Sequence, residues 1–394
     1  MTPAAPTRPA VLMSLPHSGL SVAEFYSMHF LGALFPLTAG VTLYGWRALA
    51  SILLVCGSAA LGIAAWRRIG PRGHQLSYAH GLWLALLLSL MLPAHLATTQ
   101  PTSYSEQPWP LLPAAGFILS IFLWLLGGLG SGRVHPVLVT YLLITALFID
   151  LLVPHWVLQR NHAATGDLLH GRPADARLVQ KGPWLQREKA PGVDSESTEP
   201  AAEALSRYTS GREKPPRGWL PLQGLLRDNV PPLEDLIVGG HPGPIGASSA
   251  IAVIVGGLFL LYRGLIDYRI PMIIIAVEFA GLLILPIPSA VTAHTHWHWI
   301  ASRSPGVGWA AGITFADYEI MASPVLFMAF FLATSPSIRP MARRARIIYA
   351  ILAGGLSAAL QLYLGVSYGP YLALLLASLL TPALDMLFRP RALV

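Results

Sequence analysis

The chain has 394 residues, of which 54% are hydrophobic and only 11% are charged. Soluble domains carry about 25% charged residues, so this composition excludes a soluble globular protein and indicates an integral membrane protein. The net charge of +7 is unevenly distributed: residues 160–235 hold 11 basic and 11 acidic side chains, which leaves 15 of the 26 basic and 8 of the 19 acidic residues elsewhere. The positive excess therefore belongs to the ends of the membrane spans. The sequence contains no basic stripe with interleaved aromatic residues, which would indicate nucleic-acid binding.

Cysteine content and the N-terminus exclude two further possibilities. Cys56 is the only cysteine, which excludes an internal disulfide and an iron–sulfur cluster, because such a cluster needs about four ligands. Residues 1–16 are proline-rich and lack the charged and apolar regions of a cleaved signal peptide. We expect a short cytoplasmic tail there.

Apolar segments predict an all-α polytopic fold. A helix needs roughly 20 apolar residues to cross a bilayer. Ten stretches satisfy this: residues 26–46, 47–66, 80–99, 109–130, 136–157, 246–265, 270–289, 313–334, 346–365 and 368–388. The first two need a turn at residues 44–47 (YGWR) to be separate spans.

Arginines in the short loops predict the orientation of these spans. Basic residues are retained in cytoplasmic loops, and alternate loops hold Arg67, Arg68, Arg72, Arg133, Arg263, Arg269, Arg339, Arg343, Arg344 and Arg346. Ten spans with both termini in the cytoplasm fit this pattern, so the long polar segment should lie outside. We expect three regions: a first repeat (1–157), an extracytoplasmic loop (158–242) and a second repeat (243–394), with the five-span repeats inverted relative to each other.

The loop 158–242 is rich in Pro, Glu, Arg and Ser and has too few apolar residues to form a core of its own. A loop of this length is usually functional or disordered. Two amphipathic pieces, residues 184–189 and 219–227, could lie along the membrane surface.

Two glycine-rich segments are candidate binding elements. Residues 127–136 (GGLGSGRVHP) join the fourth and fifth spans, where Gly127, Gly128 and Gly130 would permit close backbone approach around a cofactor or ion, or simply form a tight turn. Residues 239–249 (GGHPGPIGASS) open the sixth span. Free N–H groups at a helix start, together with hydroxyls, can hold a phosphate, and the alternative is an ordinary capped helix start. The residues in question are Gly243, Gly246, Ser248 and Ser249.

Ionisable residues inside apolar spans indicate an ion or proton path. Glu278 lies near the middle of the seventh span and is the strongest candidate, ahead of His29 and Asp150. His294, His296 and His298 alternate in residues 294–299 (HTHWHW). They could bind a metal with Asp317 or Glu319, or belong to an interfacial aromatic belt with Trp297 and Trp299, which we favour.

Several blocks, in order along nearly the whole chain, resemble the RnfD/NqrB family, the large membrane subunits of the Rnf complex and of the sodium-translocating NADH:quinone reductase. Residues 330–340 (FFLATSPSIRP) are similar to the family's FFMATDPVTSP, residues 127–136 to GGLGxNPFNPA and residues 240–249 to GxxGSIGETS. Residues 17–22, 44–49 and 365–390 resemble the family's opening and its last span.

The resemblance implies a subunit of an electron transport complex in the bacterial inner membrane, rather than a complete enzyme. It implies FMN joined to a threonine of the outer loop by a phosphoester bond, a second, noncovalent flavin such as riboflavin, partner subunits of the Rnf or Nqr type, and coupling to Na⁺ or H⁺ movement. Thr198 in residues 193–200 (VDSESTEP) is nearest to the attachment sequence, although glutamate follows it. Ala247 and Ser335 stand where the family has acidic residues, so the alternative is a flavin-less transport or accessory protein.

Overall fold

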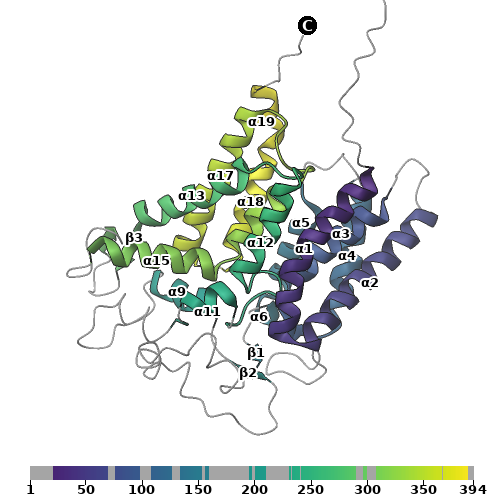
Figure 1. Ribbon diagram of the computed structural model, residues 1–394, viewed down its shortest axis with the longest axis horizontal. Coiled ribbons are helices and arrows are strands. Elements are labelled where there is room, and N and C mark those ends of the chain that lie inside the picture. The colour runs from purple at the N-terminus through teal and green to yellow at the C-terminus, as the bar shows by residue number, and fades with distance from the viewer. Residues whose placement is uncertain are drawn as a thin grey trace, which may run out of the picture.

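A computed structural model describes residues 21–69, 76–97, 108–126, 134–152, 156–158, 195–197, 200–209, 230–231, 233–239, 241–289, 296–299, 308–365 and 367–388. Within these ranges the chain is mainly helical, and the helices form two bundles that lie side by side (Figure 1). The first bundle comes from the N-terminal half of the chain and the second from the C-terminal half.

The first bundle contains five long helices: α1 (Val22–Tyr44), α2 (Trp46–Ile69), α3 (Tyr78–Met91), α4 (Leu111–Leu125) and α5 (Pro136–Leu147). Short helices η1 (Ala94–Leu96) and α6 (Ile149–Leu152) follow α3 and α5. Gly45 has φ +68° and separates α1 from α2, a backbone conformation that glycine adopts without a steric penalty. This confirms the turn predicted at residues 44–47.

The second bundle contains α12 (Ala250–Tyr262), α13 (Arg269–Ile284), α15 (Gly308–Ala322), α17 (Arg343–Leu364) and α18 (Gly369–Leu379). Three short helical pieces complete it: α16 (Val325–Phe327), the π-helical turn η3 (Met328–Leu332) and α19 (Thr381–Leu387). Small residues let its helices approach closely: a Cβ on Gly281 would lie 2.8 Å from the Ala358 Cβ.

The most extensive helix contact is at the same position in both bundles. The second and fourth long helices make the most extensive contact in each, α2 with α4 and α13 with α17. Between the bundles, α1 contacts α12 and α5 contacts α18. Helices at the same position in the two bundles therefore meet across the junction. The two repeats and their inverted orientation stay a prediction.

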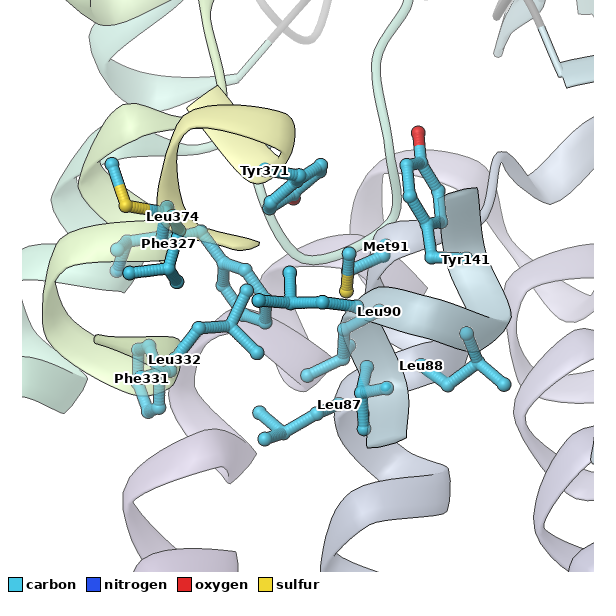
Figure 2. Close-up of a cluster of buried hydrophobic side chains, with 14 of the residues drawn as sticks. Leu87, Leu88, Leu90, Met91, Tyr141, Phe327, Phe331, Leu332, Tyr371 and Leu374 are labelled. Atoms are coloured by element: carbon cyan, nitrogen blue, oxygen red, sulfur yellow. The ribbon is translucent and has the colours of Figure 1, made fainter. Parts of the chain in front are cut away.

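The core is continuous across the junction of the bundles. Figure 2 shows Leu87, Leu90 and Met91 from α3 facing Phe331 from η3 and Leu374 from α18. These side chains are buried. The tilted pair Trp83–Phe331, with ring centroids 6.4 Å apart, also joins the two halves.

Prolines make most helices shorter than the predicted spans. A proline cannot donate a backbone hydrogen bond and disfavours helical geometry before it. Accordingly, α3 ends before Pro93, α13 ends before Pro286, and the segment from α15 to η3 bends by 64° at Pro324. The segment from α18 to α19 bends by 41° just before Pro382.

Each of the ten predicted windows contains a described helix. In the described part of the chain, α2 and α17 alone are long and apolar enough to cross a membrane as single helices, and two bent pairs raise the number to four. The composition and these helices support a polytopic membrane protein, while the count of ten spans stays a prediction.

The predicted outer loop supplies elements at one end of the molecule. Strand β1 (Trp156–Leu158) pairs antiparallel with β2 (Ser195–Ser197), and α9 (Ala201–Thr209) and α11 (Leu233–Val238) lie near them (Figure 1). Helix α19 lies at the opposite end. The amphipathic pieces predicted at residues 184–189 and 219–227 lie outside the described residues.

Arginines gather at the end that carries α19, which we call the arginine-rich end. Arg67 lies over the Tyr78 ring at the start of α3, Arg263 reaches Met28 near the start of α1, and Arg346 pairs with Asp267. The Met341 backbone N–H donates to Asp385 of α19. This segregation of charge supports the predicted orientation, in which the arginine-rich end faces the cytoplasm.

Candidate functional site

A pocket of about 180 Å³ lies where the two bundles meet the elements of the predicted outer loop. It takes side chains from both bundles and from α9. Its described lining residues are Met91, Tyr141, Thr145, Ile149, Leu152, Pro200, Ala202, Glu203, Pro242, Gly243, Pro244, Ala322, Pro324, Gly365, Ser367, Tyr368 and Tyr371. They are mostly apolar or aromatic, and none of them is basic. Such a wall suits a flat, largely apolar ligand with a few polar atoms.

Two tyrosines from equivalent helices of the two bundles meet at this pocket. Tyr141 of α5 and Tyr371 of α18 form an edge-on ring pair with centroids 5.0 Å apart, and Figure 2 shows them on opposite sides of the junction. The Tyr371 hydroxyl is buried and has no hydrogen-bond partner among the described residues. Buried hydroxyls are normally satisfied by protein, water or ligand, so water or a bound molecule is expected to supply this partner.

The second glycine-rich segment runs along the end of α3. The Gly246 N–H donates to the Leu90 carbonyl at 2.7 Å, and the Ile245 N–H donates to the Leu92 carbonyl at 3.1 Å. A Cβ on Gly246 would lie 2.6 Å from the Leu90 Cβ, so glycine is required for this approach. The segment ties the start of the second bundle to the first.

Four residues of this segment were predicted to hold a cofactor phosphate, and they have different roles in the structure. Gly243 lines the pocket. The Gly246 N–H is already bonded, the Ser248 hydroxyl donates to the Ile245 carbonyl, and the Ser249 hydroxyl accepts from the Ala252 N–H as the N-cap of α12. Contact of a cofactor with these residues stays a prediction, and Gly243 is the best placed.

Thr198 lies outside the described residues, but both flanking elements are described. Ser197 ends β2, and Pro200 lines the pocket. Gly127, Gly128 and Gly130 also lie outside the described residues. Of that first glycine-rich segment the structure describes Val134, His135 and Pro136, and His135 is the N-cap of α5.

Glu278 is fully buried on α13, in the middle of the second bundle. Its Oε1 accepts a hydrogen bond of 3.0 Å from the Ser357 hydroxyl of α17, and its Oε2 has no partner in the part of the chain that the structure describes. Glu319 of α15 is also buried and lies within electrostatic range of Glu278. A carboxyl group with a free oxygen in an apolar bundle is suited to bind a cation or a proton.

Residues 330–340, which carry the strongest family resemblance, begin inside the π-helical turn and lead to the arginine-rich end. The Thr334 hydroxyl donates to the Phe330 carbonyl at 2.6 Å, and the Tyr349 hydroxyl donates to the Ala333 carbonyl at 3.4 Å. Arg346 donates from Nε to the Pro340 carbonyl and from Nη2 to the Met341 carbonyl. A π-helical turn often marks a functional position. Here the hydrogen bonds from Thr334 and Tyr349 hold the end of the turn in place.

Asp267 holds the segment that follows residue 340 in place through its ion pair with Arg346. Arg346 Nη1 lies 2.9 Å from Asp267 Oδ2, and the Arg269 backbone N–H donates to Asp267 Oδ1 at 3.2 Å. Partial burial raises the pKa of Asp267, but these hydrogen bonds outweigh it and hold the pKa of the carboxyl below its usual range. The aspartate is therefore ionised and paired at neutral pH.

The remaining residues predicted to bind an ion or a metal lie apart from one another. Asp150 is exposed on α6, whereas His29 is buried on α1. His294 lies outside the described residues. His296 and His298 belong to strand β4 (His296–Trp299), which pairs antiparallel with β3 (Pro286–Ser289), so the end of the predicted seventh span is a hairpin and not a helix. In the described part of the chain, no group of three or more His, Cys, Asp or Glu side chains is arranged to hold a metal.

Sequence reasoning did not identify Ser357, Tyr141 or Tyr371. A serine or tyrosine in an apolar helix gives no local signal, because its partner comes from a helix far away in the sequence. Tyr371 follows Pro370 in the first turn of α18, which indicates a helix start but nothing of the pocket that this tyrosine lines.

These features define a polytopic helical membrane protein of two bundles, with a pocket at their junction and a buried carboxyl group in the second bundle. Its sequence matches the model of the NQR2, RnfD, RnfE family over residues 13–394, and the chain belongs to that family. This confirms the resemblance found in the sequence motifs.

Curated relatives are similar at modest identity. The chain is 26% identical over 371 residues to the D component of an ion-translocating oxidoreductase complex of Stutzerimonas stutzeri, covering 93% of this chain and 90% of the relative. It is 30% identical over 166 residues to the D component of a Na⁺-translocating ferredoxin:NAD⁺ oxidoreductase complex of Acetobacterium woodii. It is 29% identical over 157 residues to the D component of a proton-translocating ferredoxin:NAD⁺ oxidoreductase complex of Clostridium ljungdahlii. These last two matches cover 43% and 41% of those relatives, and 41% and 39% of this chain.

Proposed function

We propose that this protein is a membrane subunit of an electron transport complex, in which a flavin carries electrons and their passage is coupled to movement of Na⁺ or H⁺. Family membership over residues 13–394 supports the assignment to such a complex. The relatives are named as components of ion-translocating oxidoreductase complexes, with sodium in one name and protons in another. The partners would be the other membrane subunits of an Rnf- or Nqr-type complex, in the bacterial inner membrane.

The observation that carries the flavin proposal is the pocket between the bundles. It lies at the end where β1, β2, α9 and α11 gather, and Pro200 in its wall is two residues from Thr198. Its aromatic and apolar wall fits an isoalloxazine ring, and the unpartnered Tyr371 hydroxyl can bond a ring carbonyl or nitrogen. Because no described lining residue is basic, a phosphate fits better outside, at Thr198.

A bound flavin supplies one-electron and two-electron chemistry, and the protein supplies binding, orientation and the exclusion of water. Tyr141, Tyr371 and Gly243 would hold the ring, and α9 would cover it. Glu278 would hold the coupling cation or proton, since one of its oxygens is bonded to Ser357 and the other is free.

The flavin proposal is tested by denaturing gel electrophoresis of the purified protein under ultraviolet light. We expect a fluorescent band for the parent and for Thr209→Ala, a control threonine in α9 whose hydroxyl bonds the Ser206 carbonyl. The Thr198→Ala variant should be dark. Fluorescence that survives in Thr198→Ala would refute attachment at this residue.

Noncovalent flavin is measured separately, as the flavin released from the parent by acid denaturation. Tyr371→Phe removes only the unpartnered hydroxyl, so we expect it to lower the released flavin, whereas Tyr349→Phe, which breaks a bond outside the pocket, should leave the amount unchanged.

One sequence feature favours a second candidate function, a flavin-less transport or accessory protein. Glu199 follows Thr198 directly, and its carboxylate would repel the phosphate of FMN. A dark band for the parent, together with no releasable flavin, would support this function and overturn the first.

A further inference from the structure

Two exposed arginines open helix α17 at the arginine-rich end of the molecule. Arg343 and Arg344 begin its first turn, and neither side chain has a hydrogen bond or an ion pair with a described residue. Arg346, in the next position but one, is paired with Asp267 at 2.9 Å. Asp385 of α19 accepts a backbone hydrogen bond at 2.9 Å from the segment that precedes the helix. The three arginines therefore carry more positive charge than these two carboxylates can neutralise.

The position of the two free arginines in their helix is electrostatically unfavourable. A helix N-terminus is positive and favours acidic residues, whereas a C-terminus favours basic ones. The first turn of α17 contains no acidic residue, and Ala342 at its N-cap supplies no side-chain hydrogen bond. By contrast, Arg67 and Arg68 lie in the last turn of α2, where the dipole favours them. Retention of arginine on the cytoplasmic side accounts for both pairs, but only the pair in α17 is repelled by its own helix.

Helix α17 places these arginines at the level of the lipid headgroups. It has 22 residues and is long and apolar enough to cross a membrane alone. Its length of about 33 Å slightly exceeds a hydrocarbon core of about 30 Å. Ile347 and Ile351 follow Arg343 at intervals of four residues, and they are 37% and 45% exposed. Residues four apart share a helix face, so an exposed apolar strip begins directly below the arginines.

We propose that Arg343 and Arg344 bind the phosphate of an anionic phospholipid, one acyl chain of which lies along Ile347 and Ile351. Guanidinium groups bind phosphate through paired, charge-assisted hydrogen bonds. Basic clusters at the ends of membrane helices recognise anionic headgroups. A lipid matches both parts of the surface, the charge and the apolar strip, whereas an acidic protein surface would match only the charge. This site is separate from the pocket and from Glu278, and it does not depend on a flavin.

The test is native mass spectrometry of the purified full-length protein, with phosphatidylglycerol and phosphatidylcholine of the same acyl chains added at equal concentration. We expect the parent to retain phosphatidylglycerol in preference. Arg343→Gln/Arg344→Gln should weaken its binding about twenty-five-fold, since each basic residue at an anionic surface strengthens binding about fivefold. Arg67→Gln/Arg68→Gln is the matched control, with the same change of charge at the same end of the molecule, and should leave the affinity nearly unchanged.

Three results would overturn the proposal. One is a parent protein that retains the two lipids equally, which would leave the arginines to an acidic partner or to topology alone. Another is equal weakening in the two double variants, because the lipid would then respond only to the overall charge of this end. The third is displacement of the lipid by an equal concentration of glycerol phosphate, which has the phosphate but no acyl chain. The first and third measurements use the parent protein, so they decide the matter even where a variant fails to fold.

Discussion

At the scale of single residues, Glu278 shows how this chain holds a carboxyl group inside an apolar bundle. An isolated buried carboxylate is costly, and only one of the two oxygens is satisfied, by the Ser357 hydroxyl. Gly281, one turn further along α13, has Ala358 of α17 as its neighbour. The two helices are thus close enough for a short side chain such as serine to reach the carboxyl. The other oxygen, which has no partner among the described residues, is where the proposed cation or proton would bind.

Asp267 leads to a prediction about pH. Because its pKa in the folded protein lies below the ordinary value of 3.8, the ionised and paired form stabilises the fold above that value, and this contribution is lost as the pH falls through the lower folded pKa. Asp267→Asn removes the charge at every pH. We expect the parent to unfold at higher temperature than Asp267→Asn at pH 7, with the difference shrinking below about pH 4. Thermal unfolding in detergent between pH 7 and pH 3 measures this.

Exposed Asp150 is the control for that experiment. Asp150→Asn should leave the unfolding temperature nearly unchanged over the same pH range. A difference between parent and Asp267→Asn that grows on acidification would contradict the pairing of Asp267 with Arg346.

At the scale of helices, the packing of α2 against α4 depends on single glycines, and two of them in the same helix make a matched pair. A Cβ on Gly62 would lie 2.6 Å from the Ser120 Cβ, whereas a Cβ on Gly57 would meet nothing within 4 Å. Gly62→Ala should destabilise the protein by about 1–3 kcal/mol through overpacking. Gly57→Ala should stabilise it by up to about 1 kcal/mol, since alanine is the better helix former.

Unfolding in detergent, followed by circular dichroism, compares the two variants. Ser120 also accepts a hydrogen bond from Trp66 Nε1 at 3.2 Å, so displacement of Ser120 in Gly62→Ala should change the fluorescence of that tryptophan. Equal stability of the two alanine variants would show that α2 and α4 are further apart than described.

The helices and the buried acid could be predicted from the sequence, but the pocket could not. Apolar composition is a local property, so every predicted span contains a helix, and the mid-span position of Glu278 indicated its burial. The ends of the helices are set by prolines such as Pro286 and Pro324. A 20-residue window of apolar composition does not detect the effect of a single proline. The meeting of Tyr141 with Tyr371 depends on contacts between segments distant in the chain, which no local pattern encodes.

At the scale of the whole molecule, the separation of charge between the two ends predicts the sidedness of the protein. The described arginines at the ends of α2 and α12 and the start of α17 lie at the end that carries α19, while α9, α11, β1 and β2 lie at the other. Arginine is retained on the cytoplasmic side during insertion. The loop 158–242 should therefore face the outside, and with it the pocket lined by Gly243 and Pro200.

Cysteine labelling in intact cells tests this orientation. In a Cys56→Ser background, Ser210→Cys in the outer loop should react with a membrane-impermeant maleimide added to cells whose outer membrane has been opened. Ala392→Cys near the C-terminus should react only after the inner membrane is broken. The opposite pattern would place the pocket on the cytoplasmic side and the arginine-rich end outside.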